Sequence, residues 1–469
     1  MSLRFTNTLG GKIEDFQPLE AGHVRMYSCG PTVYGPAHVG NFRAFLLGDM
    51  VRRYLEWSGY RVTWVMNITD VDDRIIRDLG QKSGTLDELT APHIARFKED
   101  LAALRIGPPT VLSRATEHIP EMATLVRKLI DDGHAYTADD GSVFFRISTW
   151  PAYGTLAKLD PEQARSTERV AADDYGKDDV RDFALWKGTK ADEPSWTTVV
   201  GEGRPGWHIE CSAMSMKYLG ESFDIHTGGV DLIFPHHENE IAQSEAATGK
   251  RFVKVWLHNA HLQLGGEKMA RRVGNIEKPA EVYAAGYSPS ELRYALTATH
   301  YRAPLEWGDG TLDNARAAVE RLSTAIAALD AYKQEHDNDA TLDGVLATAQ
   351  KSFKAGMDDD LNVSGALAAV FDLVRELNRR VDARTLSTAD AGRGAAALRN
   401  FDSVLGVLDV PDALPEGAHE LLGQRAVARA AREWTTSDRL RDKLAGIGVI
   451  VEDTRDGQRW RVTARHDGA

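Results

Sequence analysis

The residues with the clearest chemistry in this sequence are of the types that bind zinc. His236 and Glu240 are four residues apart, so in a helix both would project from one face. Cys211 and Cys29 would add two thiolates, and two thiolates, an imidazole and a carboxylate complete a four-ligand site. The alternative is that both cysteines are buried and unreactive, and that the segment after Pro235 is only a polar helix start.

Three glycine-containing segments have features of ligand-binding loops. His38 and Gly40 lie where a loop enters a predicted helix, and a helix N-terminus attracts anions. Residues 265–272 form a glycine-led basic loop whose cations could clamp a triphosphate, although a basic loop can also be merely solvated. Residues 226–231 contain two adjacent glycines, which indicate either close backbone approach to a ligand or a tight turn.

The elements around these residues predict a parallel sheet. Residues 23–28 read as a strand, 41–58 as a helix with apolar residues on one face, and 60–66 as a second strand. Such a β-α-β unit places its strands in parallel, and ligands of parallel sheets bind at the carboxyl ends of the strands. We therefore expect Cys29, His38 and residues 67–70 to meet at one rim.

Composition and charge limit the classes of protein that fit. The 469 residues are 42% hydrophobic and 27% charged, with a net charge of −13, which argues against a general nucleic-acid-binding protein. Residues 421–469 differ from the rest of this acidic chain, because their net charge is +3. Two cysteines and an N-terminus with no apolar run predict a multidomain protein of the cytoplasm with no membrane segment.

Compositional changes along the chain divide it into zones. Residues 109–205, with turns, exposed aromatic residues and a polar run at 171–182, read as an insertion between two halves of the sheet. Helical spacing at 317–332 and 366–381 predicts a helix bundle, and a Pro- and Gly-containing break at 410–417 precedes a small basic tail. The expected domains are 1–108 with 206–265, 109–205, 266–304, 305–410 and 418–469.

Several motifs, in their order and spacing, resemble the cysteinyl-tRNA synthetase family. They are Cys29-Gly30-Pro31-Thr32-Val33-Tyr34, His38-Val39-Gly40, Asn67-Ile68-Thr69-Asp70, Gly206-Trp207-His208-Ile209-Glu210-Cys211-Ser212-Ala213-Met214, Pro235-His236-His237-Glu238-Asn239-Glu240-Ile241-Ala242-Gln243-Ser244 and Glu267-Lys268-Met269. Residues 357–362 and 453–454 extend the likeness to the C-terminal part of the chain.

The resemblance implies an α/β fold of class I. Its parts would be a Rossmann-type parallel-sheet catalytic domain with a connective-peptide insertion, a stem-contact region with a KMSKS-like loop at 266–304, an α-helical bundle and a small α/β anticodon-binding module. One zinc ion would be held by Cys29, Cys211, His236 and Glu240. A thiolate is a good zinc ligand and a serine hydroxyl is not, so the ion would select cysteine without an editing domain.

The resemblance also implies the reaction and its residues. A monomer would convert ATP, with Mg²⁺, and L-cysteine to cysteinyl-adenylate, and would then transfer the cysteinyl group to the 3′ end of cysteine tRNA. The implied catalytic residues are His38, Asn41, Lys268 and Arg271. The implied binding residues are Gly30, Thr32, Gly40, Asn67, Thr69, Trp207, His226, Gly229, Asp231, Lys268 and Arg271, with Trp207 and His226 flanking the substrate side chain.

The sequence departs from the family pattern at three places. Asn41 stands at the second histidine of HIGH, Ala44 replaces a hydroxyl residue, and KMSKS reads Lys268-Met269-Ala270-Arg271-Arg272. Arginine keeps the charge of lysine but changes a point charge to a planar fork. These changes indicate a divergent second copy of the synthetase. Two alternatives stay open: a ligase that transfers cysteine to an amino sugar in mycothiol synthesis, and a non-catalytic binding or regulatory protein.

Overall fold

The computed structural model describes residues 2–81, 84–159, 177, 179, 181–308, 310–335, 337–408, 417–447, 449–454 and 457–462. Most of the polar run at 171–182 and of the break at 410–417 lies outside these residues. The chain divides into two compact units, Met1–Gly406 and Val407–Ala469, which are described separately.

The centre of the first unit is a five-stranded parallel sheet in the order β12-β11-β3-β4-β5. Its strands are β3 (His23–Ser28), β4 (Arg61–Ile68), β5 (Val111–Arg114), β11 (Phe223–Gly229) and β12 (Val253–Asn259). Helix α1 (Val39–Trp57) connects β3 to β4 and confirms the predicted β-α-β unit. Strand β5 lies beyond residue 108, so the sheet takes in the start of the segment expected to be the insertion.

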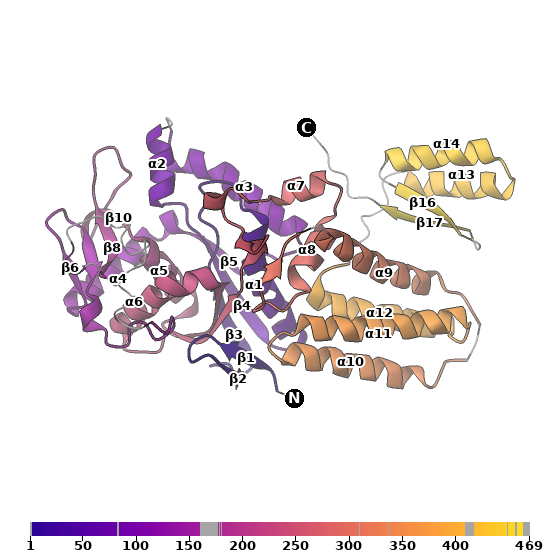
Figure 1. Cartoon of the computed structure of the whole chain (residues 1–469), viewed down its shortest axis with the longest axis horizontal. Helices are drawn as coiled ribbons and strands as arrows, with labels where there is room; N and C mark the ends of the chain where they lie inside the picture. Colours follow the sequence, from indigo (N-terminus) through magenta and orange to yellow (C-terminus); the bar gives the residue numbers. More distant parts are fainter. Residues whose placement is uncertain are drawn as a thin grey trace. The chain divides into compact units, whose positions relative to one another are not determined.

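Helices cover the sheet, so its strands are buried on both faces. Every residue of β11 is buried, as is usual for the inner strands of a parallel sheet. Helix α1 packs on β3, β4, β11 and β12, and α5 (Trp207–Leu219) packs on β3 and β4. Figure 1 shows them with the more distant α2 (Asp73–Gln81), α3 (Leu86–Ala103) and α6 (Glu238–Thr248). A capping box stabilises the start of α3, where Thr85 and Glu88 satisfy each other's backbone N–H groups.

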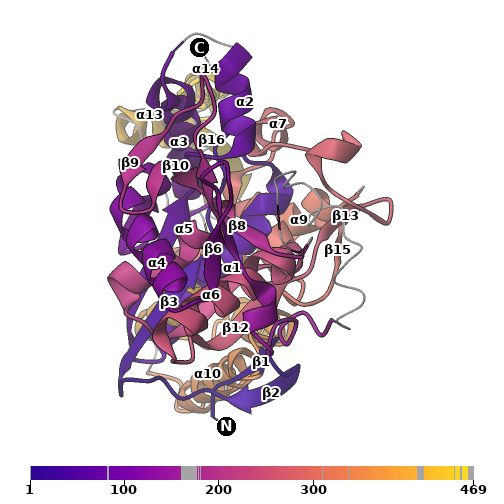
Figure 2. The same ribbon diagram turned by 90° about the vertical axis from the view of Figure 1, so that its left-hand side faces the viewer.

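The insertion is a second sheet, which is antiparallel and has the order β6-β7-β8-β10-β9. Its elements are α4 (Ile119–Asp131), β6 (Ala135–Thr137), β7 (Val143–Phe145), β8 (Phe183–Gly188), β9 (Trp196–Thr198) and β10 (Gly201–Pro205). These strands face the viewer in Figure 2. The expectation of exposed aromatic residues here is wrong for Phe144, Phe145 and Trp186, which form part of a buried core.

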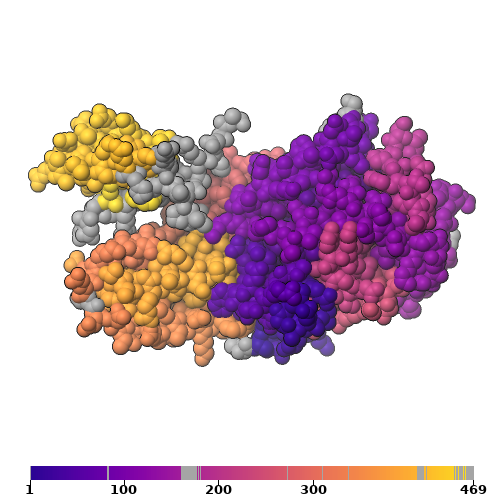
Figure 3. Space-filling view, turned by 180° about the vertical axis from the view of Figure 1, so that it is seen from behind, coloured from indigo at the N-terminus to yellow at the C-terminus, as the bar shows by residue number. Residues whose placement is uncertain are grey.

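A small sheet and two helices follow the parallel sheet. They are β13 (Leu262–Leu264), β14 (Glu267–Lys268), α7 (Pro279–Ala284), α8 (Pro289–Thr297) and β15 (Leu305–Glu306). The predicted bundle then consists of α9 (Thr311–Ala331), α10 (Leu342–Asp358), α11 (Val363–Asp382) and α12 (Thr388–Leu405). Figure 3 shows the bundle, in orange, packed against the indigo N-terminal part of the same unit.

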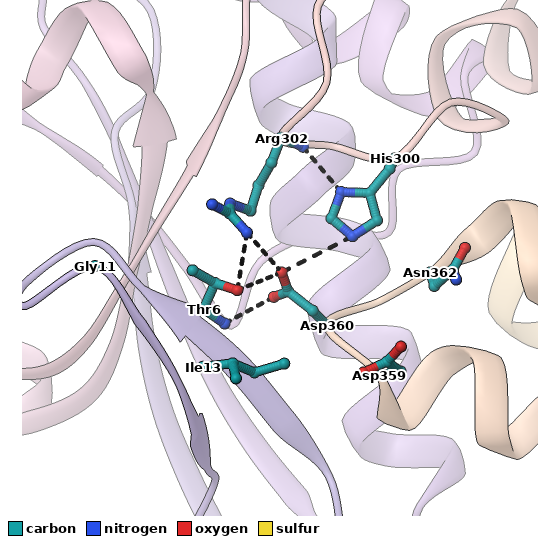
Figure 4. Close-up of a pocket in the computed structure, with 8 residues that line it drawn as sticks. All are labelled: Thr6, Gly11, Ile13, His300, Arg302, Asp359, Asp360 and Asn362. Atoms are coloured by element: carbon teal, nitrogen blue, oxygen red, sulfur yellow. Dashed lines mark hydrogen bonds and ion pairs between the residues drawn. The ribbon is translucent and has the colours of Figure 1, made fainter.

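The N-terminal hairpin of β1 (Arg4–Asn7) and β2 (Lys12–Asp15) joins the bundle to the sheet. Asp360 accepts hydrogen bonds from the backbone N–H and the hydroxyl of Thr6, at 2.8 and 2.6 Å. Figure 4 shows this contact in a pocket of about 410 Å³, where Arg302 and His300 also face the Asp360 carboxylate. Since Asp360 is fully paired, the family-like motif at 357–362 anchors the hairpin.

The second unit is a small α/β module. It consists of α13 (Ala418–Ala430), α14 (Trp434–Gly446), β16 (Val449–Thr454) and β17 (Gly457–Val462). Its apolar core includes Leu422, Leu444 and Val449, and the buried Arg425 donates to Asp453 at 2.8 Å. In both units, none of the helices described is long and apolar enough to cross a membrane.

Candidate active site and metal centre

The candidate site lies at the point of the sheet where the chain order reverses. Strands β3 and β11 are neighbours there. The chain passes from β3 to β4 towards one edge of the sheet and from β11 to β12 towards the other edge. Ligands of open parallel sheets bind in the crevice at such a point, outside the carboxyl ends of the strands. Cys29 and Gly30 follow β3 directly, and Gly229 ends β11.

Four side chains from distant parts of the chain meet at this point. We call Cys29, Cys211, His236 and Glu240 the metal cluster, because one donor atom of each lies within 4.8 Å of the donors of the others. The two sulfurs are 3.9 Å apart, and the Nε2 of His236 is 3.4 Å from the sulfur of Cys211 and 3.1 Å from the Oε1 of Glu240. All four residues are buried, and the structure brings together the four residues that the sequence proposed as metal ligands.

The electrostatics of the metal cluster favour the anionic forms of Glu240 and Cys211 but not of Cys29. Burial raises the pKa of the Glu240 carboxyl, but the imidazoles of His226 and His236 outweigh this and lower it to about 2. Burial likewise raises the pKa of Cys211, but the hydrogen bond with Cys29 and the proximity of His236 lower it to about 6. Burial and Cys211 together raise the pKa of Cys29. Cys211 is therefore the thiol that ionises first, and deprotonated thiols are the form that binds metals.

A second set of donors overlaps with the metal cluster. His226 and His237 lie with Cys29 and Glu240 in another group whose donor atoms are within 4.8 Å of one another. The Nε2 of His237 is 3.3 Å from the sulfur of Cys29, and its Nδ1 is 2.7 Å from the Nε2 of His258. His237 was not among the residues predicted to form the site, although its place directly after His236 in a polar segment is a signal that could have identified it.

Trp207 and His226, which the resemblance places beside the substrate side chain, both lie next to the metal cluster. The ring of Trp207 stacks on His236, with centroids 4.2 Å apart. His226 is fully buried against Trp256, and its Nε2 lies 3.1 Å from the Oε2 of Glu240. Both side chains therefore contact members of the metal cluster.

A chain of hydrogen bonds fixes the backbone beside the metal cluster. The N–H of Gly30 donates to Asn67 at 2.8 Å, Asn67 donates to the hydroxyl of Thr69 at 3.1 Å, and Thr69 donates to Glu210 at 2.8 Å. A Cβ on Gly30 would lie 1.7 Å from the carbonyl oxygen of Asn67, so only glycine fits there. Thr32 extends this contact through an isolated β-bridge to Thr69. Glu210, which burial keeps at a raised pKa, was not among the predicted site residues.

The segment predicted to bind phosphate begins helix α1. His38 is the N-cap residue, and its backbone N–H donates to the side-chain oxygen of Asn41 at 3.0 Å. The amide oxygen of Asn41 therefore caps the helix, while its NH₂ group is the part that could donate to a ligand. Burial, Arg271 and Lys268 lower the pKa of His38 to about 4, so the imidazole is neutral at neutral pH. A Cβ on Gly40 would lie 3.1 Å from the His38 ring.

The basic loop lies against the same segment. Lys268 pairs with Asp231 at 2.9 Å, and a Cβ on Gly229 would lie 2.5 Å from the Asp231 carboxylate. The guanidinium of Arg271 donates to the carbonyl of Pro36 and lies over the ring of Tyr34, 4.8 Å from its centroid. The structure thus brings together the two segments predicted to bind ATP, although Pro36 and Arg271 are 235 residues apart in the sequence.

Comparisons with known proteins agree with this arrangement. Residues 15–317 match the family model of the class I (C) tRNA synthetase catalytic domain, residues 352–409 match a DALR domain, and residues 412–461 match a cysteinyl-tRNA ligase anticodon-binding domain. The cysteine–tRNA ligase of Symbiobacterium thermophilum is 46% identical over 98% of this chain and 100% of its own length, and that of Koribacter versatilis is 43% identical over the same shares.

The structural comparisons concern the fold alone. A methionyl-tRNA synthetase of Mycobacterium tuberculosis, in complex with methionyl-adenylate, superposes with a TM-score of 0.59. The superposition covers 88% of this chain and 96% of that chain, at 16% sequence identity.

Proposed function

The chain belongs to the cysteinyl-tRNA synthetases, which are cysteine–tRNA ligases, and we propose that it selects its amino acid with a zinc ion held by the metal cluster. The observation that carries this proposal is the convergence of two sulfurs, an imidazole and a carboxylate in one buried group. Four donors of this kind, two of them soft thiolates, fit zinc.

The residues present fit the ion in two further respects. The Oε1 of Glu240 is buried, faces the Nε2 of His236 at 3.1 Å and has no hydrogen bond of normal geometry among the described residues, so it can serve as a ligand of the ion. The buried oxygen of Tyr27 also has no hydrogen-bond partner among the residues that the structure describes, and burial, followed by Cys211 and Cys29, raises its pKa. When bound, zinc supplies a soft acceptor for the cysteine sulfur, and an apolar pocket that distinguished cysteine from serine by shape alone would reach only ~1–3 kcal/mol.

We propose that the residues around the metal cluster position the reacting groups. The family uses ATP, and the neutral His38, the amide of Asn41 and the N-terminus of α1 would bind its phosphates. Lys268 and Arg271 would stabilise the charge that develops on the leaving pyrophosphate. The Gly30–Asn67–Thr69 chain would hold the amino acid beside the metal cluster.

The second unit supports cysteine tRNA as the acceptor. Residues 412–461 match an anticodon-binding domain. Trp434 and Trp460 are 57% and 42% exposed, and exposed aromatic rings in a basic module are suited to stack on unpaired bases. These features, with the matches to cysteine–tRNA ligases over the whole chain, favour tRNA over an amino-sugar acceptor, which would not need this module. We further propose that the protein acts as a monomer in the cytoplasm, with both cysteines reduced.

The test of this function is a set of three measurements on the purified chain. We expect cysteine-dependent ATP–pyrophosphate exchange, no comparable exchange with serine, and one zinc ion per chain by elemental analysis. Aminoacylation is then compared for cysteine tRNA and for an amino-sugar acceptor. Exchange without zinc would contradict the selection mechanism, and the absence of exchange in a zinc-loaded protein would favour the non-catalytic alternative raised by the altered KMSKS-like loop.

A further inference from the structure

The KMSKS-like loop of this chain has an arginine where the family pattern has its second lysine, and the structure gives that arginine specific partners. The guanidinium of Arg271 lies 4.8 Å from the ring centroid of Tyr34 and donates to the carbonyl of Pro36. A planar guanidinium can stack on a ring and donate in its own plane at the same time, which a lysine ammonium cannot do.

Two further features show that this contact is closely fitted. A Cβ on Gly35 would lie 2.6 Å from the Nη1 of Arg271, so the absence of a side chain at Gly35 makes room for the guanidinium. Arg74 also lies over the Tyr34 ring, at 5.2 Å. Arg74 follows Asp73, which pairs with Lys187 and Arg204 of the insertion at 2.7 Å each, so the start of α2 is held in place.

We propose that Tyr34 is a positioning residue for the activation reaction, because its ring holds Arg271 beside His38 and thereby sets where this cation meets the phosphates of ATP. The inference rests on the proposed ATP-binding role of the loop. A cation held over a ring is already in place when charge develops on the leaving group, so the contact contributes to the rate of activation rather than to cysteine binding.

The first arm of the test reports the contact itself and needs no substrate. The zinc-loaded full chain is digested briefly with trypsin, and the rate of cleavage after Arg271 is followed by mass spectrometry. We expect Tyr34→Leu to accelerate this cleavage several-fold and Tyr34→Phe, which keeps a ring, to leave it close to the original rate. Tyr136→Leu is the matched control, because it removes a ring from a similar contact in the insertion, where the guanidinium of Arg146 lies 4.6 Å from the centroid of Tyr136. This variant should leave the rate of cleavage after Arg271 unchanged.

The second arm is a double-mutant cycle in cysteine-dependent pyrophosphate exchange. We expect Tyr34→Leu to lower kcat about tenfold, with an unchanged KM for cysteine, and to have no further effect once Arg271→Ala is present. Gly35→Ala should reproduce the loss of kcat with the ring intact, because its Cβ displaces the guanidinium.

The outcomes separate this inference from the proposed function. An equal effect of Tyr34→Leu with and without Arg271 would overturn it, and so would a cleavage rate that does not respond to Tyr34→Leu. If the original chain shows no exchange, the proposed function fails and the positioning role fails with it, while the trypsin arm still decides whether the ring holds Arg271.

Discussion

Asp49 on α1 and Arg293 on α8 are 244 residues apart in the sequence, yet their buried side chains form an ion pair of 2.7 Å. Arg293 also donates to the carbonyl of Leu405 at the end of α12, at 2.7 Å, and to that of Leu104 after α3, at 2.9 Å. This one guanidinium therefore connects the catalytic sheet's first helix to the region after the KMSKS-like loop and to the bundle.

Replacing Arg293 is expected to destabilise the first unit strongly. Arg293→Met leaves Asp49 buried without one of its cations and leaves two carbonyls unpaired, at a cost of roughly 3–5 kcal/mol. Urea unfolding followed by tryptophan fluorescence measures the loss. Arg375→Met, which removes an exposed pair with Asp372, is the control and should change stability by less than about 1 kcal/mol. Similar midpoints for the two variants would show that the buried pair has no special role.

The same carboxylate predicts a dependence of stability on pH. Burial opposes the ionisation of Asp49, but Arg293, Arg53 and Arg52 outweigh it and lower the pKa to about 2. A lowered pKa in the folded state stabilises the fold above the ordinary value near 4, and this stabilisation disappears as the pH falls towards 2. The free energy of unfolding of the wild-type protein should therefore exceed that of Asp49→Asn by about 2–3 kcal/mol at pH 5. This difference should decrease as the pH is lowered towards 2. Unfolding midpoints across this range measure it, and a gap that does not depend on pH would contradict the assignment.

Loss of a thiolate from the metal cluster is expected to abolish both metal binding and cysteine activation. Cys211→Ser replaces a sulfur that lies 3.9 Å from Cys29 with a hydroxyl, which is a poor zinc ligand. Elemental analysis and pyrophosphate exchange are the measurements. Ser215→Ala, a small buried change on the same helix, should keep the ion. Full metal content in Cys211→Ser would show that the proposed ligand set is wrong.

The two overlapping donor sets can be separated by neighbouring histidines. The metal cluster contains Cys211 and His236, and the alternative set contains His226 and His237 in their place. We expect His236→Asn to lose zinc and His237→Asn to retain it, because only His236 contacts both Cys211 and Glu240 at hydrogen-bonding distances. Zinc content after dialysis decides between them, and the reverse pattern would assign the ion to the set with His226 and His237.

Replacing the exposed tryptophans of the second unit is expected to weaken tRNA binding without changing cysteine activation. Stacking on a base contributes ~1–3 kcal/mol, so Trp434→Ala or Trp460→Ala should weaken the affinity for cysteine tRNA roughly tenfold or more. Pyrophosphate exchange, which does not involve tRNA, should stay unchanged. Val427→Ala is a suitable control, since Val427 is 70% exposed in the same unit but cannot stack. Equal affinity in all variants would exclude base stacking by these rings.

Much of the architecture could be predicted, because the positions of strands, helices and turns depend on patterns among residues that are close together in the sequence. The boundaries of β3 at 23–28 and the helix that follows it come from apolar periodicity and from the turn-forming residues after Ser28. The metal cluster could be predicted because Cys29 and Cys211 are the two cysteines of the chain and because the surrounding motifs resemble a known family.

The sequence by itself therefore determined the strand and helix pattern, the residue types of the site and the family. The tertiary structure alone decided that β5 joins the parallel sheet, that Glu210 supports Thr69, and that Arg271 rests on Tyr34. The physical reason is the separation of the interacting residues along the chain. Apolar periodicity and helix capping depend on residues only a few positions apart, whereas these contacts join segments that are tens to hundreds of residues apart. Only the packing of the folded chain fixes such distances.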